Sequence, residues 1–290
     1  MAPLTLPAHL GDAVRRSDDV AFRAWVDALP AVVAAAARRW SLQLGDPYQP
    51  GGACSWVAPA GDPAGRRLVL KVGWRHDEAQ DEAAGLPAWA GQGAVRLYEN
   101  LTDASTMMLL LERCEPGTTL RMLPAVEQDV VIAGLLNRLW RTPAGAHPFR
   151  PLSRMCADWA DACEARPTPL DPGLSRAGIA LLRELPLSAA SSVLLCTDLH
   201  AGNVIATHRE PWLVIDPKPY VGDPHYDVLQ HLLNNREQLF TDPRGQAHRM
   251  ADLAGLDRDR VVAWLFARSV RESFDQAELR PVATALAALV

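Results

Sequence analysis

The spacing of apolar residues predicts strands in the first part of the chain and mainly helices in the rest. From Asp19 to Leu44, apolar side chains recur every three or four residues, which is typical of an amphipathic helix, and Pro30 is expected to divide the stretch into two helices. Short apolar runs bounded by turn residues then predict two strand pairs. These strands are expected within Gln49–Ala58 and Arg67–Gly73, joined by a turn at Pro59–Gly65, and at Val95–Tyr98 and Thr106–Glu112.

A helical pattern also covers His76–Ala90, and helices dominate after the Pro-Gly pair at residues 116–117. Two short apolar runs, Val193–Cys196 and Trp212–Asp216, interrupt this second part and predict strands that flank a loop. The change of pattern near residues 113–118 predicts two lobes. We expect an N-terminal lobe at 1–113, with a helical extension at its start, and a helical lobe at 114–290.

Composition excludes several classes of protein. The 290 residues carry a net charge of −5, whereas a nucleic-acid-binding protein needs a basic surface. No window of about 18 uninterrupted apolar residues predicts a membrane span. The five cysteines form no CxxC pair, so we expect reduced thiols in a cytoplasmic protein rather than disulfides or a zinc site.

The basic residues are distributed unusually. Of the 29, only Lys71 and Lys218 are lysines, and the other 27 are arginines. A bias of this kind reflects genome composition, so each lysine raises the question of what an arginine could not do there. A compact ammonium on a flexible stem suits point-charge contact with phosphate better than a planar guanidinium does.

Three polar residues after residue 195 indicate phosphoryl transfer. Asp198 and Asn203 lie five residues apart, and Asp216 follows at the end of an apolar strand. Such chemistry needs a carboxylate that accepts the proton of the attacking hydroxyl and oxygen ligands that hold Mg²⁺. We predict the first role for Asp198 and the second for Asn203 and Asp216. The alternative is that Asp198, His200 and Asn203 only form turns in a surface loop, and the strand that ends at Asp216 weighs against it.

A second group of residues is predicted to hold the nucleotide. Lys71 lies in a strand, and the preceding Gly51-Gly52 turn could let the backbone approach phosphate closely. Glu78 and Glu82, one helical turn apart, are both candidates to pair with Lys71. The order of strand, lysine, helix and glutamate recurs in kinases. Taken singly, a strand lysine is usually solvated and a Gly-Gly pair usually forms only a turn.

Two segments give the chain a family resemblance. Asp198–Val204 (DLHAGNV) resembles the catalytic loop of aminoglycoside phosphotransferases, and Ile215–Asp227 (IDPKPYVGDPHYD) is similar to the branch of streptomycin 6-kinases and hydroxyurea phosphotransferases. The resemblance runs in collinear order from about Trp40 to about Leu233. Further matching segments are Leu70–Trp74, Asp81–Ala84, Ala94–Leu97 and Leu109–Arg113.

The resemblance implies a fold and a set of roles. The expected fold is α+β and bilobal, like that of protein kinases, with an N-terminal antiparallel sheet. Lys71 would contact the α- and β-phosphates, and Glu82 would hold it. The hinge from Glu112 to Cys114 would meet adenine through backbone groups. Cys196 stands where many relatives carry a histidine, so that histidine's hydrogen bond is expected to be absent.

The acceptor site is predicted less directly. Aminoglycosides are polycations, and their pockets need unpaired carboxylates. Asp223 and Asp227 are candidates, although the first Asp of the Gly-Asp-Pro segment also has an anchoring role in this family. Glu272, Asp275 and Glu278 in the last long helical stretch are further candidates. The alternative for these three is pairing with Arg268, Arg271 or Arg280 on a solvated surface.

Together these features predict a phosphotransferase that moves the γ-phosphate of ATP, or of another nucleoside triphosphate, to a hydroxyl with the help of Mg²⁺. The expected acceptor is a small and cationic molecule, streptomycin or a related aminoglycoside. A kinase of a sugar, amino sugar or other small alcohol would use the same residues. A pseudokinase that binds nucleotide without turnover is the third alternative, although Lys71, Asp198, Asn203 and Asp216 are all present.

Overall fold

The computed structural model describes residues 4–76, 80–143 and 145–289. The chain folds into two compact units, one up to Gly117 and the other from Thr118 onward. The division therefore falls a few residues after the predicted lobe boundary at residue 113.

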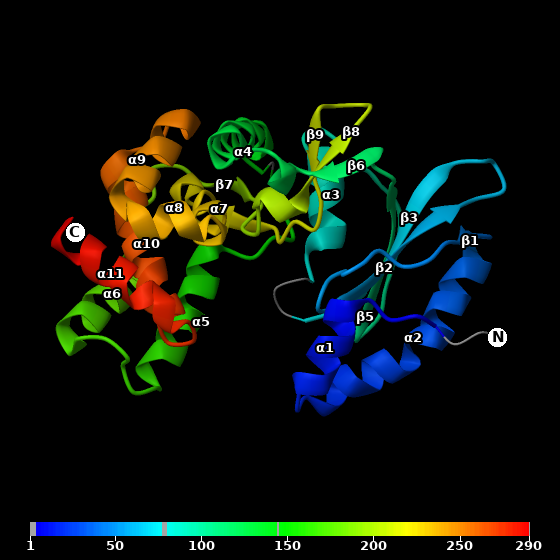
Figure 1. The fold of residues 1–290 in the computed structure, drawn as a ribbon, viewed down its shortest axis with the longest axis horizontal. Helices are drawn as coiled ribbons and strands as arrows, with labels where there is room; N and C mark the ends of the chain where they lie inside the picture. The colour runs from blue at the N-terminus through cyan, green and yellow to red at the C-terminus, as the bar shows by residue number, and fades with distance from the viewer. Residues whose placement is uncertain (1–3, 77–79, 144, 290) are drawn as a thin grey trace. The chain divides into compact units, whose positions relative to one another are not determined.

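The first unit contains an antiparallel sheet with strand order β1-β2-β3-β5-β4. Figure 1 labels β1, β2, β3 and β5 of this sheet. The strands are β1 Gln43–Leu44, β2 Ser55–Gly61, β3 Arg67–Trp74, β4 Leu97–Thr102 and β5 Thr106–Glu112. Strand β5 has the predicted bounds. Strand β2 runs three residues past the predicted end at Ala58 and into the predicted turn, because Pro59 stays in register opposite Val69. The carbonyl of Pro59 still accepts a hydrogen bond from the backbone N–H of Gly45. The proline therefore removes only the one hydrogen bond that a backbone N–H at this position would donate.

Two helices, α1 Ala8–Arg16 and α2 Val20–Arg39, cover one face of this sheet. The predicted break at Pro30 was wrong, because α2 continues through it. A proline in a helix removes one backbone hydrogen bond. Here buried Leu29 and Val33 on either side pack into the sheet core. By length and composition alone, α2 could also span a membrane, but helices in the core of a protein often have the same length and composition.

On the other side of β3 lies α3 Glu82–Trp89. Side chains alternate along a strand, so Leu70 and Val72 face α1 and α2 whereas Lys71 points to the opposite face. The helix predicted for His76–Ala90 is shorter in the structure, because α3 begins only at Glu82. Residues 77–79, including the candidate Glu78, lie outside the described part of the chain.

The second unit is mainly helical, as predicted. Helix α10 lies among α6, α9 and α11, and nearly all of its apolar side chains are buried. A side chain at Gly178 of α6 would lie 2.5 Å from Val270, so the two helices approach closely there. The helices are α4 Ala125–Leu139, α5 Leu152–Glu164, α6 Pro172–Glu184, α7 Leu229–Asn234, α8 Arg236–Thr241, α9 Pro243–Ala254, α10 Arg258–Glu272 and α11 Arg280–Leu286. Short 3-10 helices occur at Leu120–Met122, Ala201–Asn203, Pro224–Tyr226, Ala277–Leu279 and Ala287–Leu289.

Short strands position the loops of the second unit. One sheet has the order β6-β8-β9, and β7 pairs with β10 in another. The strands are β6 Pro116–Thr119, β7 Val193–Leu195, β8 Val204–Thr207, β9 Trp212–Val214 and β10 Tyr220–Gly222. The sequence pattern predicted β7 and β9. It did not predict β8 and β10, which are only three or four residues long and are only partly apolar.

Candidate active site

The loop after β7 presents the predicted catalytic carboxylate. Thr197 has a positive φ of 51°, a conformation that residues other than glycine adopt rarely and often at functional sites. The side chain of the next residue, Asp198, is 15% exposed. Its Oδ2 lies 2.7 Å from the Nζ of Lys218, and its Oδ1 accepts a hydrogen bond of 2.9 Å from the Nε2 of Gln230 on α7. Both carboxylate oxygens are therefore held by side chains.

Asn203 and Asp216 lie beside this loop, as the sequence motif predicts. The Nδ2 of Asn203 donates to the carbonyl of Asp198 at 3.0 Å. The carbonyl of Asn203 accepts from the N–H of Ile215 at 2.9 Å, and the antiparallel pair β8–β9 starts from this contact. Asp216 comes next, with a positive φ of 52°. The three predicted residues are thus brought together within the second unit.

The side chains of Asn203 and Asp216 fit a magnesium ion. Because the amide nitrogen of Asn203 is committed to Asp198, its other terminus is the oxygen that a hard cation requires. Among residues 4–76, 80–143 and 145–289, no group of three or more His, Cys, Asp and Glu side chains is suited to a metal. A magnesium site of one carboxylate and one amide oxygen would instead be completed by phosphate oxygens and water. The ligand role of the two residues stays a prediction.

Asp227 anchors the loop that carries Asp198. Its side chain is fully buried, and its two oxygens accept from the N–H groups of Cys196 at 2.9 Å and Thr197 at 2.6 Å. The indole N–H of Trp140 donates to the same carboxylate at 3.0 Å. Burial raises the pKa of Asp227 to about 6, although these donors act in the opposite direction. The contacts indicate that Asp227 fixes the two residues before Asp198 rather than facing an acceptor.

Asp227→Asn should test this anchor. One carboxylate oxygen becomes an NH₂ group that faces an N–H donor, so we expect the free energy of unfolding to fall by about 2 kcal/mol, the usual cost of an unsatisfied buried polar group. Urea denaturation at pH 7.5 measures the change. The matched control is Asp158→Asn, because Asp158 is 58% exposed and should change stability by less than about 0.5 kcal/mol.

The same pair of proteins gives a pH dependence. The folded state holds the Asp227 proton more tightly than the unfolded chain, where the pKa is 3.8. The unfolded state therefore loses its proton first, and the stability of the wild type falls relative to Asp227→Asn between about pH 4 and pH 6, then levels off. If the stability of the wild type rose relative to Asp227→Asn as the pH increased from about 4 to 6, the raised pKa would be contradicted.

Asp223 is also buried, with 1% of its surface exposed. Its Oδ2 accepts from the Nε of Arg260 and from the indole of Trp264, both at 2.7 Å. Its Oδ1 accepts from the backbone N–H of His225 at 3.0 Å and lies 2.6 Å from that residue's Nδ1. Burial opposes ionisation, but these hydrogen bonds outweigh it and lower the pKa of Asp223. The contacts support the anchoring alternative rather than contact with an acceptor.

Two other residues of the loop have structural contacts. The Nδ1 of His200 accepts from the N–H of Gly202 at 3.0 Å, and burial lowers the pKa of His200. A side chain at Gly202 would lie 2.7 Å from the Nε of Arg121, so the end of that flexible side chain would have to move. Burial is the main reason that the pKa of Cys196 lies well above its usual value, and the negative charges of nearby Asp227, Asp198 and Asp216 raise it further. These contacts make His200 a loop-stabilising residue and Cys196 an unreactive thiol.

The acids predicted for the last long helical stretch pair with arginines. Glu272 is 5% exposed, and its two oxygens meet Arg268 at 2.8 Å and Arg271 at 2.9 Å. Asp275 meets Arg166 at 2.8 Å. Glu278 lies 2.6 Å from Arg236 and not beside the expected Arg280. The pairing alternative is thus the one the contacts support, with the difference that Glu272 is buried instead of solvated.

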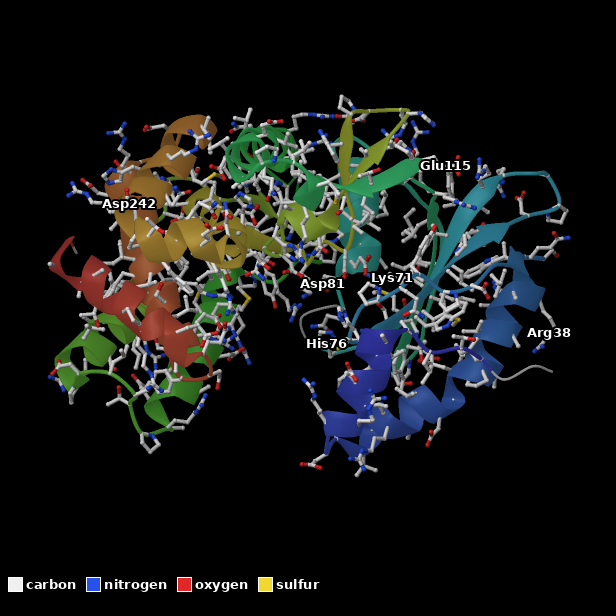
Figure 2. All side chains as sticks on the ribbon, viewed as in Figure 1. Arg38, Lys71, His76, Asp81, Glu115 and Asp242 are labelled. Carbon is white, nitrogen blue, oxygen red and sulfur yellow. The ribbon has the colours of Figure 1, made fainter. Side chains whose placement is uncertain are left out.

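In the first unit, Lys71 and Glu82 form a buried ion pair. The Nζ of Lys71 lies 2.6 Å from the Oε2 of Glu82, and the side chains are 8% and 1% exposed. Figure 2 labels Lys71 and Asp81, the residue that precedes α3. Glu82, one of the two glutamates left open by the sequence, is thus observed next to Lys71, and Glu78 lies outside the described part of the chain. The contact of Lys71 with phosphate stays a prediction.

The Gly51-Gly52 turn is held by the start of the chain. The backbone N–H of His9 donates to the carbonyl of Pro50 at 3.0 Å, and its Nδ1 lies 2.9 Å from the carbonyl of Gly51. Gly51 has a φ of 71°, and a side chain there would lie 2.5 Å from Pro7. Packing against the N-terminal segment is thus one reason for this glycine. Close approach of phosphate to the turn stays a prediction.

The predicted adenine hinge follows β5. The N–H of Glu112 donates to the carbonyl of Arg96 at 2.9 Å, and the Oε2 of Glu112 accepts from the N–H of Arg96 at 3.0 Å. Cys114 follows as a half-buried cysteine that forms no disulfide. These contacts fix the end of the strand, and the role of Glu112 and Cys114 in binding adenine stays a prediction.

Two contacts of Asp198 were not predicted from the sequence. Lys218 and Gln230 follow Asp198 by 20 and 32 positions, and only the fold brings them to its carboxylate. For Lys218 a signal was present, because it is one of only two lysines in a chain of arginines. For Gln230 the sequence offers no such signal.

The chain resembles known proteins over most of its length. Residues 39–278 match the family described as aminoglycoside/hydroxyurea antibiotic resistance kinase. The chain belongs to this family. The kinase is 34% identical to streptomycin 6-kinase of Streptomyces griseus, with 92% of this chain and 89% of the relative covered. It is 36% identical to hydroxyurea phosphotransferase of Kitasatospora aureofaciens, with 96% and 82% covered.

The kinase also has the fold that the resemblance implied. It is similar to the solved structure of amicoumacin kinase, determined with AMP-PNP, Ca²⁺ and amicoumacin, at a TM-score of 0.58 and 13% identity. The likeness covers 96% of this chain and 94% of the other. At this identity it shows the fold alone. The predicted bilobal protein-kinase-like architecture is confirmed, and the kinase is a small-molecule phosphotransferase by family.

Proposed function

We propose that the protein inactivates an aminoglycoside, with streptomycin as the first choice, by transferring the γ-phosphate of ATP or another nucleoside triphosphate to one of its hydroxyls. The observation that carries this proposal is the 34% identity to streptomycin 6-kinase over 92% of the chain. The loop with Asp198, Asn203 and Asp216 supplies the chemistry that such a transfer needs.

The residues have distinct roles in this reaction. The hydroxyl oxygen of the acceptor forms a bond to the γ-phosphorus while the bond from that phosphorus to the leaving nucleoside diphosphate breaks. Asp198 orients the hydroxyl and takes its proton. Lys71, held by Glu82, binds the nucleotide phosphates. Mg²⁺, when bound, neutralises phosphate charge, and Asn203 and Asp216 would hold it.

We place this reaction in the cytoplasm. None of the five cysteines, all within the described residues, forms a disulfide, which suits a reducing compartment. The proposed acceptor is a small molecule, and nothing in the net charge of −5 favours a nucleic-acid partner.

Hydroxyurea is the second candidate acceptor. The relative named hydroxyurea phosphotransferase is 36% identical to this chain. The carboxylates predicted to receive a cationic acceptor are buried or paired, Asp223 and Asp227 with N–H donors and Glu272 and Asp275 with arginines. A small uncharged acceptor needs no unpaired carboxylate, so the pairing of these carboxylates suits hydroxyurea, and the named relative is what favours it over sugars and other metabolites.

An ADP-release assay with several acceptors should decide between these functions. We expect kcat/KM with streptomycin to exceed that with glucose or glucosamine by about 10²-fold or more, because a site that hydrogen-bonds one acceptor rejects others strongly. Mass spectrometry should find one added phosphoryl group on streptomycin. Preference for hydroxyurea would select the second candidate, and preference for a sugar would refute both. Absence of magnesium-dependent ADP formation with every acceptor would indicate a pseudokinase.

A further inference from the structure

Lys218 has no role in the reaction described so far, yet its ammonium lies on the proposed catalytic carboxylate. The Nζ is 2.7 Å from the Oδ2 of Asp198, and the two side chains are 24% and 15% exposed. An ion pair with such limited access to solvent is screened less than one on the surface. The charge of Lys218 therefore acts directly on the group that is to receive a proton.

The backbone of Lys218 is fixed to the loop that carries Asp198. Its N–H donates to the carbonyl of Cys196 at 2.9 Å, and its carbonyl accepts from the Oγ1 of Thr197 at 2.6 Å. Pro217 and Pro219 lie on either side, and proline restricts both its own φ and the residue before it. The position of the ammonium is thus set at its base by the residues that precede Asp198.

The choice of lysine over arginine has a chemical reason here. An arginine can bind both oxygens of a carboxylate through its planar fork, whereas an ammonium is a point charge. In the structure Lys218 occupies Oδ2, and the neutral amide of Gln230 occupies Oδ1. A neutral hydrogen bond is the weaker of the two. An incoming hydroxyl can therefore displace Gln230 from Oδ1 while Lys218 keeps the carboxylate in place.

We propose that Lys218 is a positioning residue for phosphoryl transfer, which holds Asp198 through Oδ2 and leaves Oδ1 to the acceptor hydroxyl. The inference rests on the proposed function and goes beyond it, because it assigns the second lysine of the chain to the reaction. It also assigns to Gln230 the part of a displaceable partner of Asp198.

Kinetics of Lys218→Met test the inference first. We expect kcat to fall by about 10²-fold, the usual size of the effect when one charged or hydrogen-bonding group of an active site is removed. The Kd of ATP should stay within twofold, since Lys218 is assigned to Asp198 and not to the nucleotide. Lys218→Arg should recover only part of kcat because its fork competes for Oδ1. The control is Arg154→Met, which removes an exposed charge paired with Asp158 and should keep wild-type kcat.

Chemical rescue separates the charge from a packing effect. In Lys218→Ala, ethylammonium should raise kcat with saturation, because it can place an N–H donor and a positive charge where the Nζ was. Tetramethylammonium carries the charge without an N–H donor and should not raise it. A structural role for Lys218 predicts no rescue by either ion, and that result would overturn the inference.

A double-mutant cycle gives a readout that needs no turnover. If Asp198 and Lys218 are coupled, the decrease in Tm of Asp198→Asn/Lys218→Met should be smaller than the sum of the two single decreases. Additive decreases overturn the pairing. An active wild type whose Lys218→Met variant keeps its kcat overturns this inference and leaves the proposed function standing. A folded wild type without activity on any acceptor overturns the proposed function and, with it, the inference.

Discussion

Asp198→Ala is expected to reduce turnover by about 10²-fold or more while nucleotide affinity stays nearly unchanged. The loss follows from the usual size of general-base effects. Asp198 is held on the loop after β7 by Lys218 and Gln230, and neither contact belongs to the sheet unit that carries Lys71. Steady-state kcat and the Kd of ATP, measured by calorimetry, test the two parts of this expectation separately.

The matched control for this substitution is Asp158→Ala. Asp158 also belongs to the second unit and also pairs with a basic residue, Arg154, but the pair is largely exposed. Exposed pairs contribute little, so this variant should keep wild-type turnover and stability. Lost ATP binding together with normal residual turnover in Asp198→Ala would contradict the role of a proton acceptor.

The local part of the site could be predicted from the sequence. Asp198 and Asn203 are five residues apart, and the loop that connects them has few ways to fold once Asn203 bonds back to the carbonyl of Asp198. The apolar run that ends at Asp216 indicated a strand, and pairing of β8 with β9 returns that strand to Asn203. Short-range spacing and hydrophobic pattern are sufficient for contacts of this kind.

The global part could not be predicted in this way, because burial depends on which helices pack together. Asp227 and Glu272 look like available carboxylates in the sequence, yet both are buried and bonded. The pairing of Lys218 with Asp198 depends on β10 joining β7, and the apolar pattern did not predict β10, a three-residue strand that ends in glycine. At Pro30 the sequence predicted a break that the structure does not contain, because the tertiary packing of α2 overrides this local signal.

The pair formed by Lys71 and Glu82 links the fold of the first unit to its predicted function. Lys71 replaces an apolar residue in the middle of β3, between Leu70 and Val72, which are both completely buried. Removing two charges from water costs several kcal/mol each, and close pairing offsets that cost. The pair therefore contributes little to the stability of the unit, whereas either buried charge without the other would destabilise it strongly. A polar pair in this place calls for a functional reason, and the predicted contact of Lys71 with phosphate supplies one.

Glu82→Leu is accordingly expected to lower the free energy of unfolding by about 3–5 kcal/mol, because the buried ammonium of Lys71 loses this carboxylate. Lys71→Met/Glu82→Leu should recover most of that stability, since replacing both charges by apolar groups is often neutral. The double variant should nevertheless bind ATP poorly, because the ammonium itself is gone. Urea denaturation and calorimetric titration with ATP measure the two effects. A double variant that binds ATP as tightly as the wild type would refute the role of Lys71, and a Glu82→Leu protein of unchanged stability would refute the buried pair.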